Sequence, residues 1–200
     1  MCPNHIQEAE GVYLNKYFQG QPRPESISTH LRTRFAESPS EPWSDKLLEE
    51  HLYFLTTRFG EGSYYRSVTM QLSEFGKLYY HLQKPLFGNH LNRKRRQQAL
   101  CYAFTDADGS RSGSSDVFRC EIPHVHALFL APPKFRDEFK SALLDPCLGG
   151  ALFPLQKISV EPFSLKRGSV EKLISYCMKG YLQARPSHFQ REDLWAIFPR

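Results

Sequence analysis

Two histidines separated by one residue, within an apolar run, constrain the fold of this chain most strongly. Residues 117–130 read Val-Phe-Arg-Cys-Glu-Ile-Pro-His-Val-His-Ala-Leu-Phe-Leu and end just before a Pro-Pro pair. Their β-branched and aromatic content predicts a strand. Because strand side chains alternate between faces, His124 and His126 should project from the same face.

Both faces of this expected strand are apolar, since Leu128 and Leu130 follow the histidines and Val125 begins the other face. The pattern therefore predicts a central strand that is covered on both sides. Two imidazoles roughly 7 Å apart along a strand could share one metal ion, because imidazole is a common metal ligand. The alternative is a pair of histidines that only hydrogen-bond to their neighbours.

Other apolar patterns predict the remaining elements of the fold. The expected strands are 51–59, 99–105, 117–130 and 152–163, and the expected helices are 63–84, 133–144 and 170–184. Residues 106–116, which are rich in Gly, Ser and Asp, should connect two strands as a long hairpin loop. The resulting β-α-β-β-α-β-α order predicts an α+β fold with a central, mostly antiparallel sheet flanked by helices.

The composition favours one folded domain with two flanking segments. Residues 1–46 are rich in Pro, Ser, Glu and Gln and show no sustained period, so we expect an N-terminal extension that is partly disordered. Residues 47–185 form the expected domain, and 186–200 a short C-terminal tail. The five scattered cysteines argue against a disulfide framework. Without an apolar run near 18 residues or a signal peptide, a cytoplasmic protein with no membrane span is expected.

The last expected helix separates two kinds of side chain. Val170, Ile174, Cys177 and Tyr181 recur at helical spacing and should face the core. Tyr176 belongs to a different, polar stripe.

On that polar stripe, Lys172 and Lys179 flank Tyr176 at i−4 and i+3. Nearby positive charge favours the phenolate, which is the nucleophilic form of a phenol. The helix therefore indicates a reactive tyrosine, with an ordinary surface tyrosine as the alternative.

Basic residues suggest a polyanionic partner. The net charge is +5 and the isoelectric point about 8.9. Arg93, Lys94, Arg95 and Arg96 are consecutive cations that could contact DNA phosphates, or simply form a solvated face.

Three segments in this order resemble the motifs of a known enzyme family. They are Phe54-Leu55-Thr56-Thr57, His124-Val125-His126 and Tyr176-Cys177-Met178-Lys179. Together they resemble the HUH endonucleases, specifically the rolling-circle replication initiators of plasmids, phages and small circular DNA viruses. The resemblance covers residues 51–184.

The resemblance implies a tyrosine transesterification. Tyr176 matches the nucleophile that attacks a DNA phosphodiester, leaving a 5′-phosphotyrosyl link and a free 3′-hydroxyl. His124 and His126 match the ligands of a divalent metal, Mg²⁺ or Mn²⁺. Lys179 matches the lysine one turn beyond the nucleophile, and Thr56-Thr57 the motif that shapes the sheet near the site.

The third metal ligand is open at the level of sequence. The family usually supplies a carboxylate upstream of the histidines, and Glu121 is the nearest one. Glu121 has the wrong strand parity unless a bulge occurs at Ile122-Pro123. Glu121 is the preferred ligand, with Asp106 and Asp108 as alternatives.

The resemblance also implies the partners. The substrate would be single-stranded or hairpin DNA at an origin, contacted by residues 93–96 and by Lys172. The chain has no nucleotide-binding G-x-x-x-x-G-K-[ST] motif, so a host helicase and polymerase would complete replication. A relaxase, a single-tyrosine transposase and a non-catalytic single-stranded DNA-binding module are the alternatives.

Overall fold

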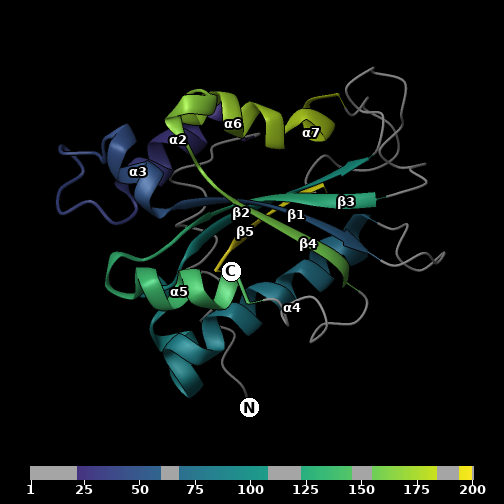
Figure 1. Ribbon diagram of the computed structural model, residues 1–200, viewed down its shortest axis with the longest axis horizontal. Coiled ribbons are helices and arrows are strands. Elements are labelled where there is room, and N and C mark those ends of the chain that lie inside the picture. Colours follow the sequence, from purple (N-terminus) through teal and green to yellow (C-terminus); the bar gives the residue numbers. More distant parts are fainter. Residues whose placement is uncertain (1–21, 60–67, 108–122, 146–154, 184–193, 200) are drawn as a thin grey trace, which may run out of the picture.

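A five-stranded antiparallel sheet forms the centre of the molecule (Figure 1). The computed structural model describes residues 22–59, 68–107, 123–145, 155–183 and 194–199. The strands are β1 (Leu52–Phe59), β2 (Leu100–Ala107), β3 (Pro123–Leu130), β4 (Leu155–Pro162) and β5 (Trp195–Phe198). Their order across the sheet is β4-β1-β3-β2-β5. The predicted α+β fold with an antiparallel sheet and flanking helices is confirmed.

Helices cover both faces of the sheet (Figure 1). The α-helices are α2 (Pro24–Thr33), α3 (Asp45–His51), α4 (Val68–Phe87), α5 (Arg136–Leu143), α6 (Val170–Cys177) and α7 (Lys179–Gln183). Short 3₁₀ turns are η2 (Gly88–Arg93), η3 (Arg95–Gln97), η6 (Pro133–Phe135) and η7 (Leu165–Arg167). Helix α4 connects β1 to β2 and α5 connects β3 to β4, on the same side of the sheet. The first four strands thus form a split βαβ arrangement, with β1 and β3 paired at its centre.

Strand β3 is buried on both faces, as its sequence predicts. Leu128 and Leu130 belong to one core, which also contains side chains of α2 and α6. Val125, Ala127 and Phe129 belong to a second core, which α4 and α5 complete. Both faces of β3 are therefore removed from water, and polar groups on it need partners within the protein.

Part of the expected N-terminal extension belongs to the folded domain. Residues 1–21 lie outside the described part, but α2 buries Ile27 and Leu31 completely in the first core. The helix begins with Pro24, a favoured first helical residue. It is only ten residues long, and two apolar positions at i and i+4 are too few to stand out in a Pro- and Ser-rich stretch.

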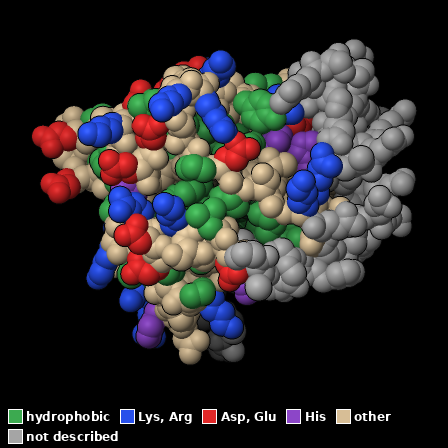
Figure 2. All heavy atoms as spheres, in the orientation of Figure 1, with side chains coloured by type: hydrophobic (Ala, Val, Ile, Leu, Met, Phe, Trp, Pro, Cys, Tyr) green, Lys and Arg blue, Asp and Glu red, His purple; other side chains and the backbone are tan. Residues whose placement is uncertain are grey.

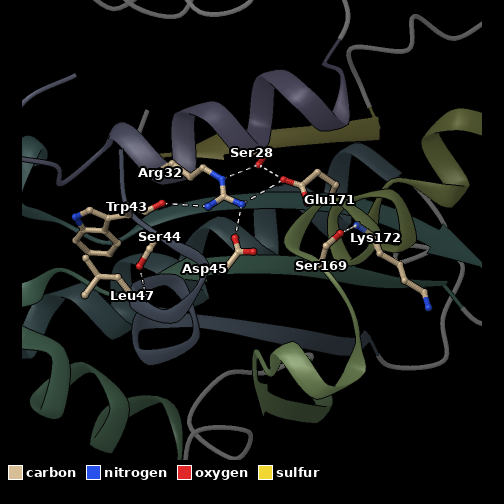
Figure 3. A network of polar contacts seen from close by, with 9 residues as sticks. All are labelled: Ser28, Arg32, Trp43, Ser44, Asp45, Leu47, Ser169, Glu171 and Lys172. Atoms are coloured by element: carbon tan, nitrogen blue, oxygen red, sulfur yellow. Dashed lines mark hydrogen bonds and ion pairs between the residues drawn. The ribbon is translucent and has the colours of Figure 1, made fainter. Parts of the chain in front are cut away.

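A polar network attaches α2 to its neighbours (Figure 3). Arg32 donates a 3.0 Å hydrogen bond to the carbonyl of Trp43 and forms ion pairs with Asp45 and, at 3.3 Å, Glu171. The Ser28 hydroxyl donates a 2.7 Å hydrogen bond to Glu171. Burial opposes ionisation of Glu171, but hydrogen bonds from Ser28 and Arg32 help to lower its pKa to about 2. The network ties α2 and α3 to α6.

Three other boundaries differ from the sequence expectations. The expected tail contains β5, whose four residues pair with β2 and are too few to show an alternating pattern. The expected helix 170–184 divides at Met178 into α6 and α7. Helix α4 continues three residues beyond its expected end, to Phe87, and contains Pro85 within its last turn.

Strand β2 extends two residues beyond its expected end, to Ala107. It therefore includes Asp106, which the sequence had placed in the loop. Residues 108–122, which complete the expected hairpin and the start of the expected strand 117–130, lie outside the described part. None of the helices in the described ranges is long and apolar enough to cross a membrane.

Candidate active site

A carboxylate joins the two histidines on one face of the sheet. Asp106 lies directly opposite His124 in the β2–β3 ladder, and opposite residues of an antiparallel pair share a face. Asp106 Oδ2 is 3.4 Å from His124 Nε2 and 3.1 Å from His126 Nε2. The three side chains are buried, with exposed fractions of 0%, 5% and 2% respectively.

These residues form a group that could hold a metal ion. Each offers one ligand atom, and the three atoms lie within 4.8 Å of one another. Two imidazoles and one carboxylate suit a divalent transition metal such as Mn²⁺ better than Mg²⁺, which prefers oxygen ligands. Burial lowers the pKa of His126, although its hydrogen bond with Asp106 opposes this effect. The neutral imidazole is the form that binds a metal.

Thr56 orients the second histidine. It lies opposite His126 in the β1–β3 ladder, and its Oγ1 is 3.1 Å from His126 Nδ1. This contact leaves Nε2 directed toward Asp106. The first sequence motif thus contributes Thr56 to the site, whereas Thr57 is buried on the opposite face.

Tyr176 lies beside the histidines, at the end of α6. Its ring centroid is 5.2 Å from that of His126 and 5.8 Å from that of Phe54 on β1. Tyr176 is partly exposed. Tyr181 is buried in the first core, as its place in the apolar stripe predicts. Tyr176 therefore combines partial exposure with a ring contact to His126.

Lys179 completes the group. Its Nζ is 2.8 Å from Asp106 Oδ2 and 4.7 Å from the centroid of the Tyr176 ring. Close packing of α7 on β2 holds it there, because a Cβ on Gly180 would lie 2.8 Å from both Asp106 Oδ1 and the Thr105 carbonyl oxygen. Only a glycine allows this approach at position 180.

A cavity of about 320 Å³ adjoins Tyr176. Phe54 of β1 and Tyr176 and Lys172 of α6 line it, together with Gly168 from the connection that leads into α6. Gly168 has φ of +131°, and a Cβ there would approach Lys172 Cδ to 2.9 Å. Lys172 extends away from the α2–α6 network (Figure 3). The cavity therefore combines aromatic rings with two cations, Lys172 and Arg167, and the carboxylate of Glu161.

The other predicted residues are not brought to this site. Residues Arg93–Arg96 lie in and between η2 and η3, before the start of β2, whereas Asp106 lies near its end. Leu100 and Asp106 are six residue steps apart along the strand, or roughly 20 Å. Glu121 and Asp108 lie outside the described residues. On the face shown in Figure 2, Lys and Arg side chains alternate with Asp and Glu rather than forming one basic patch.

Asp106 was the site residue that sequence reasoning underrated. Leu100, Tyr102 and Phe104 alternate along one face of the strand, and continuing the alternation by two residues places Asp106 on that face. The register between β2 and β3 makes it the face of the histidines. The expected strand was ended at residue 105 because the residues that follow are rich in Gly, Ser and Asp, which is typical of a loop.

No family model, curated protein or solved structure matches the chain.

Proposed function

We propose that this protein is a metal-dependent enzyme that nicks and rejoins single-stranded DNA, with Tyr176 as the nucleophile. The observation that supports this most strongly is the position of Tyr176 beside the Asp106–His124–His126 group, with its ring 5.2 Å from the ring of His126. A candidate nucleophile and a candidate metal centre thus share one face of the sheet, although they come from three elements.

The reaction is a transesterification. The Tyr176 oxygen attacks the phosphorus and loses its proton, the bond from phosphorus to the 3′-oxygen breaks, and that oxygen takes up a proton. The products are a 5′-phosphotyrosyl link and a 3′-hydroxyl, and the reverse step rejoins the strand. A divalent ion held by Asp106, His124 and His126 would polarise a non-bridging phosphate oxygen. Lys179 would offset negative charge on the phenolate or the phosphate.

The substrate would enter as a single strand. The cavity beside Tyr176 is large enough for an unpaired base, with Phe54 available for stacking and Lys172 for a phosphate. Residues 93–96 would contact DNA farther along, at the other end of β2. The role that fits these features is initiation of rolling-circle replication at a plasmid or phage origin, with a host helicase and polymerase.

A relaxase or a single-tyrosine transposase would use the same chemistry and remains the alternative within this class. A non-catalytic single-stranded DNA-binding module is the other alternative. Asp106 would be the third ligand of a metal ion held by the two histidines. Its burial favours catalysis over that module, because a binding surface has no need of a buried charge.

A cleavage assay tests the proposal. The full chain is incubated with Mn²⁺ and a pool of labelled single-stranded oligonucleotides, and covalent adducts are separated by denaturing electrophoresis. We expect an adduct that disappears with excess EDTA. Free cleavage products without an adduct, or an adduct that persists in EDTA, would contradict the mechanism.

A further inference from the structure

Lys179 contacts the oxygen atom that both histidines approach. Its Nζ is 2.8 Å from Asp106 Oδ2, the atom that lies 3.1 Å from His126 Nε2 and 3.4 Å from His124 Nε2. The Asp106 side chain is fully buried, and that of Lys179 is 16% exposed. The lysine ammonium thus contacts the same carboxylate oxygen that a metal ion shared with the histidines would use.

One buried carboxylate oxygen is poorly suited to two cations. A buried carboxylate needs a counter-charge, and in this structure the Lys179 ammonium supplies it. A divalent ion bound by the same oxygen would repel that ammonium at short range, where little water screens the charges. Binding of the metal and the Lys179–Asp106 ion pair should therefore exclude each other.

We propose that Lys179 is a built-in counter-cation of the metal centre, and that a divalent ion displaces it from Asp106 toward Tyr176. This inference rests on the metal centre of the proposed function. The ammonium already lies 4.7 Å from the centroid of the Tyr176 ring, so a change of side-chain rotamer moves it to the tyrosine. Metal binding would then release the cation that the phenolate and phosphate require.

The backbone at the start of α7 is fixed by packing, so the displacement involves the Lys179 side chain alone. Gly180, the next residue, packs so closely on β2 that its position is tied to Thr105 and Asp106. The start of α7 therefore stays near the carboxylate whether or not a metal is bound. The exchange couples the metal site to the nucleophile without a movement of helices.

Metal affinity provides a direct test, because loss of a competitor strengthens binding whereas loss of structural support weakens it. Calorimetric titration with Mn²⁺ compares the wild type with Lys179→Met, which keeps an apolar stem in the partly buried site. We expect Lys179→Met to bind Mn²⁺ about tenfold more tightly or better.

Two control variants isolate the effect. Lys179→Arg keeps the positive charge and should retain an affinity near that of the wild type. Lys166→Met removes an exposed cation from η7, so it should leave Mn²⁺ affinity unchanged. Equal or weaker binding by Lys179→Met would overturn the inference.

A second measurement applies if Lys179→Met fails to fold. In wild-type protein labelled at lysine Cε, the Lys179 resonance, assigned from its absence in Lys179→Arg, should shift when Zn²⁺ is added. An unchanged resonance at saturating metal would overturn the displacement. If the wild type binds neither ion through His126, as judged with His126→Ala, the metal centre fails and the proposed function fails with it. Metal binding with no response of Lys179 refutes this inference alone.

Discussion

The hydroxyl oxygen of Thr56 lies 3.1 Å from Nδ1 of His126, so the opposite ring nitrogen faces Asp106. A metal bound at Nε2 requires the imidazole proton to be on Nδ1, from which it would be donated to Thr56. Partners of this kind hold the ring orientation and tautomer of a metal-binding histidine. A side chain from the first sequence motif thereby supports a ligand from the second.

Replacement of Thr56 by valine, which has a similar shape, should weaken Mn²⁺ binding about tenfold, because the imidazole loses the acceptor for its Nδ1 proton. Calorimetric titration measures the change. Thr57→Val is the matched control: Thr57 lies on the opposite face, and its Oγ1 has no hydrogen-bond partner within the described residues. Equal Mn²⁺ affinities for the two variants would contradict the role of Thr56.

Asp106→Asn should weaken Mn²⁺ binding far more than Glu121→Gln, since Asp106 is, among the described residues, the carboxylate next to both imidazoles. We expect a loss of at least about tenfold for Asp106→Asn and little change for Glu121→Gln. Both substitutions remove one negative charge, so the comparison controls for long-range electrostatics. The reverse order of effects would restore Glu121 as the third ligand.

The local pattern of side chains was sufficient to predict most of the sheet. Alternation in residues 123–130 places both histidines on one face, and helical spacing separates Tyr176 from the buried Tyr181. The candidate third ligand, Asp106, was harder to predict, because its position depends on the register between β2 and β3, which are separated by a long loop. Register describes which residues of two strands pair, so it cannot be read from the sequence of either strand alone.

Local patterns failed for elements that owe their stability to tertiary contacts. Helix α2 and strand β5 are short. Burial in the first core holds α2, and pairing with β2 holds β5, rather than the propensity of either segment alone. The helical pattern in the sequence also does not report the division at Met178 into α6 and α7, or the close contact of Gly180 with β2.

Leu31→Ala should reduce the free energy of unfolding by about 2–5 kcal/mol, because it leaves a cavity in a core that α2 helps to form. Urea denaturation followed by circular dichroism measures the loss. Glu25→Ala, on the exposed side of the same helix, is the control and should change stability by less than about 0.5 kcal/mol. A negligible effect of Leu31→Ala would mean that α2 is dispensable to the fold.

Acid should destabilise the protein through His30. Burial, aided by the nearby positive charge of Arg34, lowers the pKa of His30 from 6.5 to about 4. The unfolded chain therefore binds a proton first as the pH falls, and stability is lost between about pH 6.5 and pH 4. At pH 5, protonation of His30 would reduce the free energy of unfolding by about 2 kcal/mol relative to neutral pH.

His30→Gln should remove the part of the pH dependence of the free energy of unfolding that comes from His30. The contributions of other buried histidines to that dependence are the same in the wild type and the variant. Urea denaturation at pH 7.5 and pH 5 gives the comparison. The Tyr102 hydroxyl contacts His30 Nδ1, and glutamine can retain a hydrogen bond to it. The same pH dependence in both proteins would exclude His30 as a source of acid sensitivity.

The central claim is that Tyr176 attacks the DNA backbone, and mapping the covalent adduct tests it most directly. After reaction with single-stranded oligonucleotides and Mn²⁺, the protein is digested and the peptide that bears the nucleotide is identified by mass spectrometry. Tyr176→Phe should abolish the adduct and preserve folding, whereas Tyr181→Phe, which alters a buried tyrosine five residues away, should still form it. We predict a nucleotide linked to Tyr176 through its 5′-phosphate. An adduct on any other residue, or one formed by Tyr176→Phe, would contradict the mechanism.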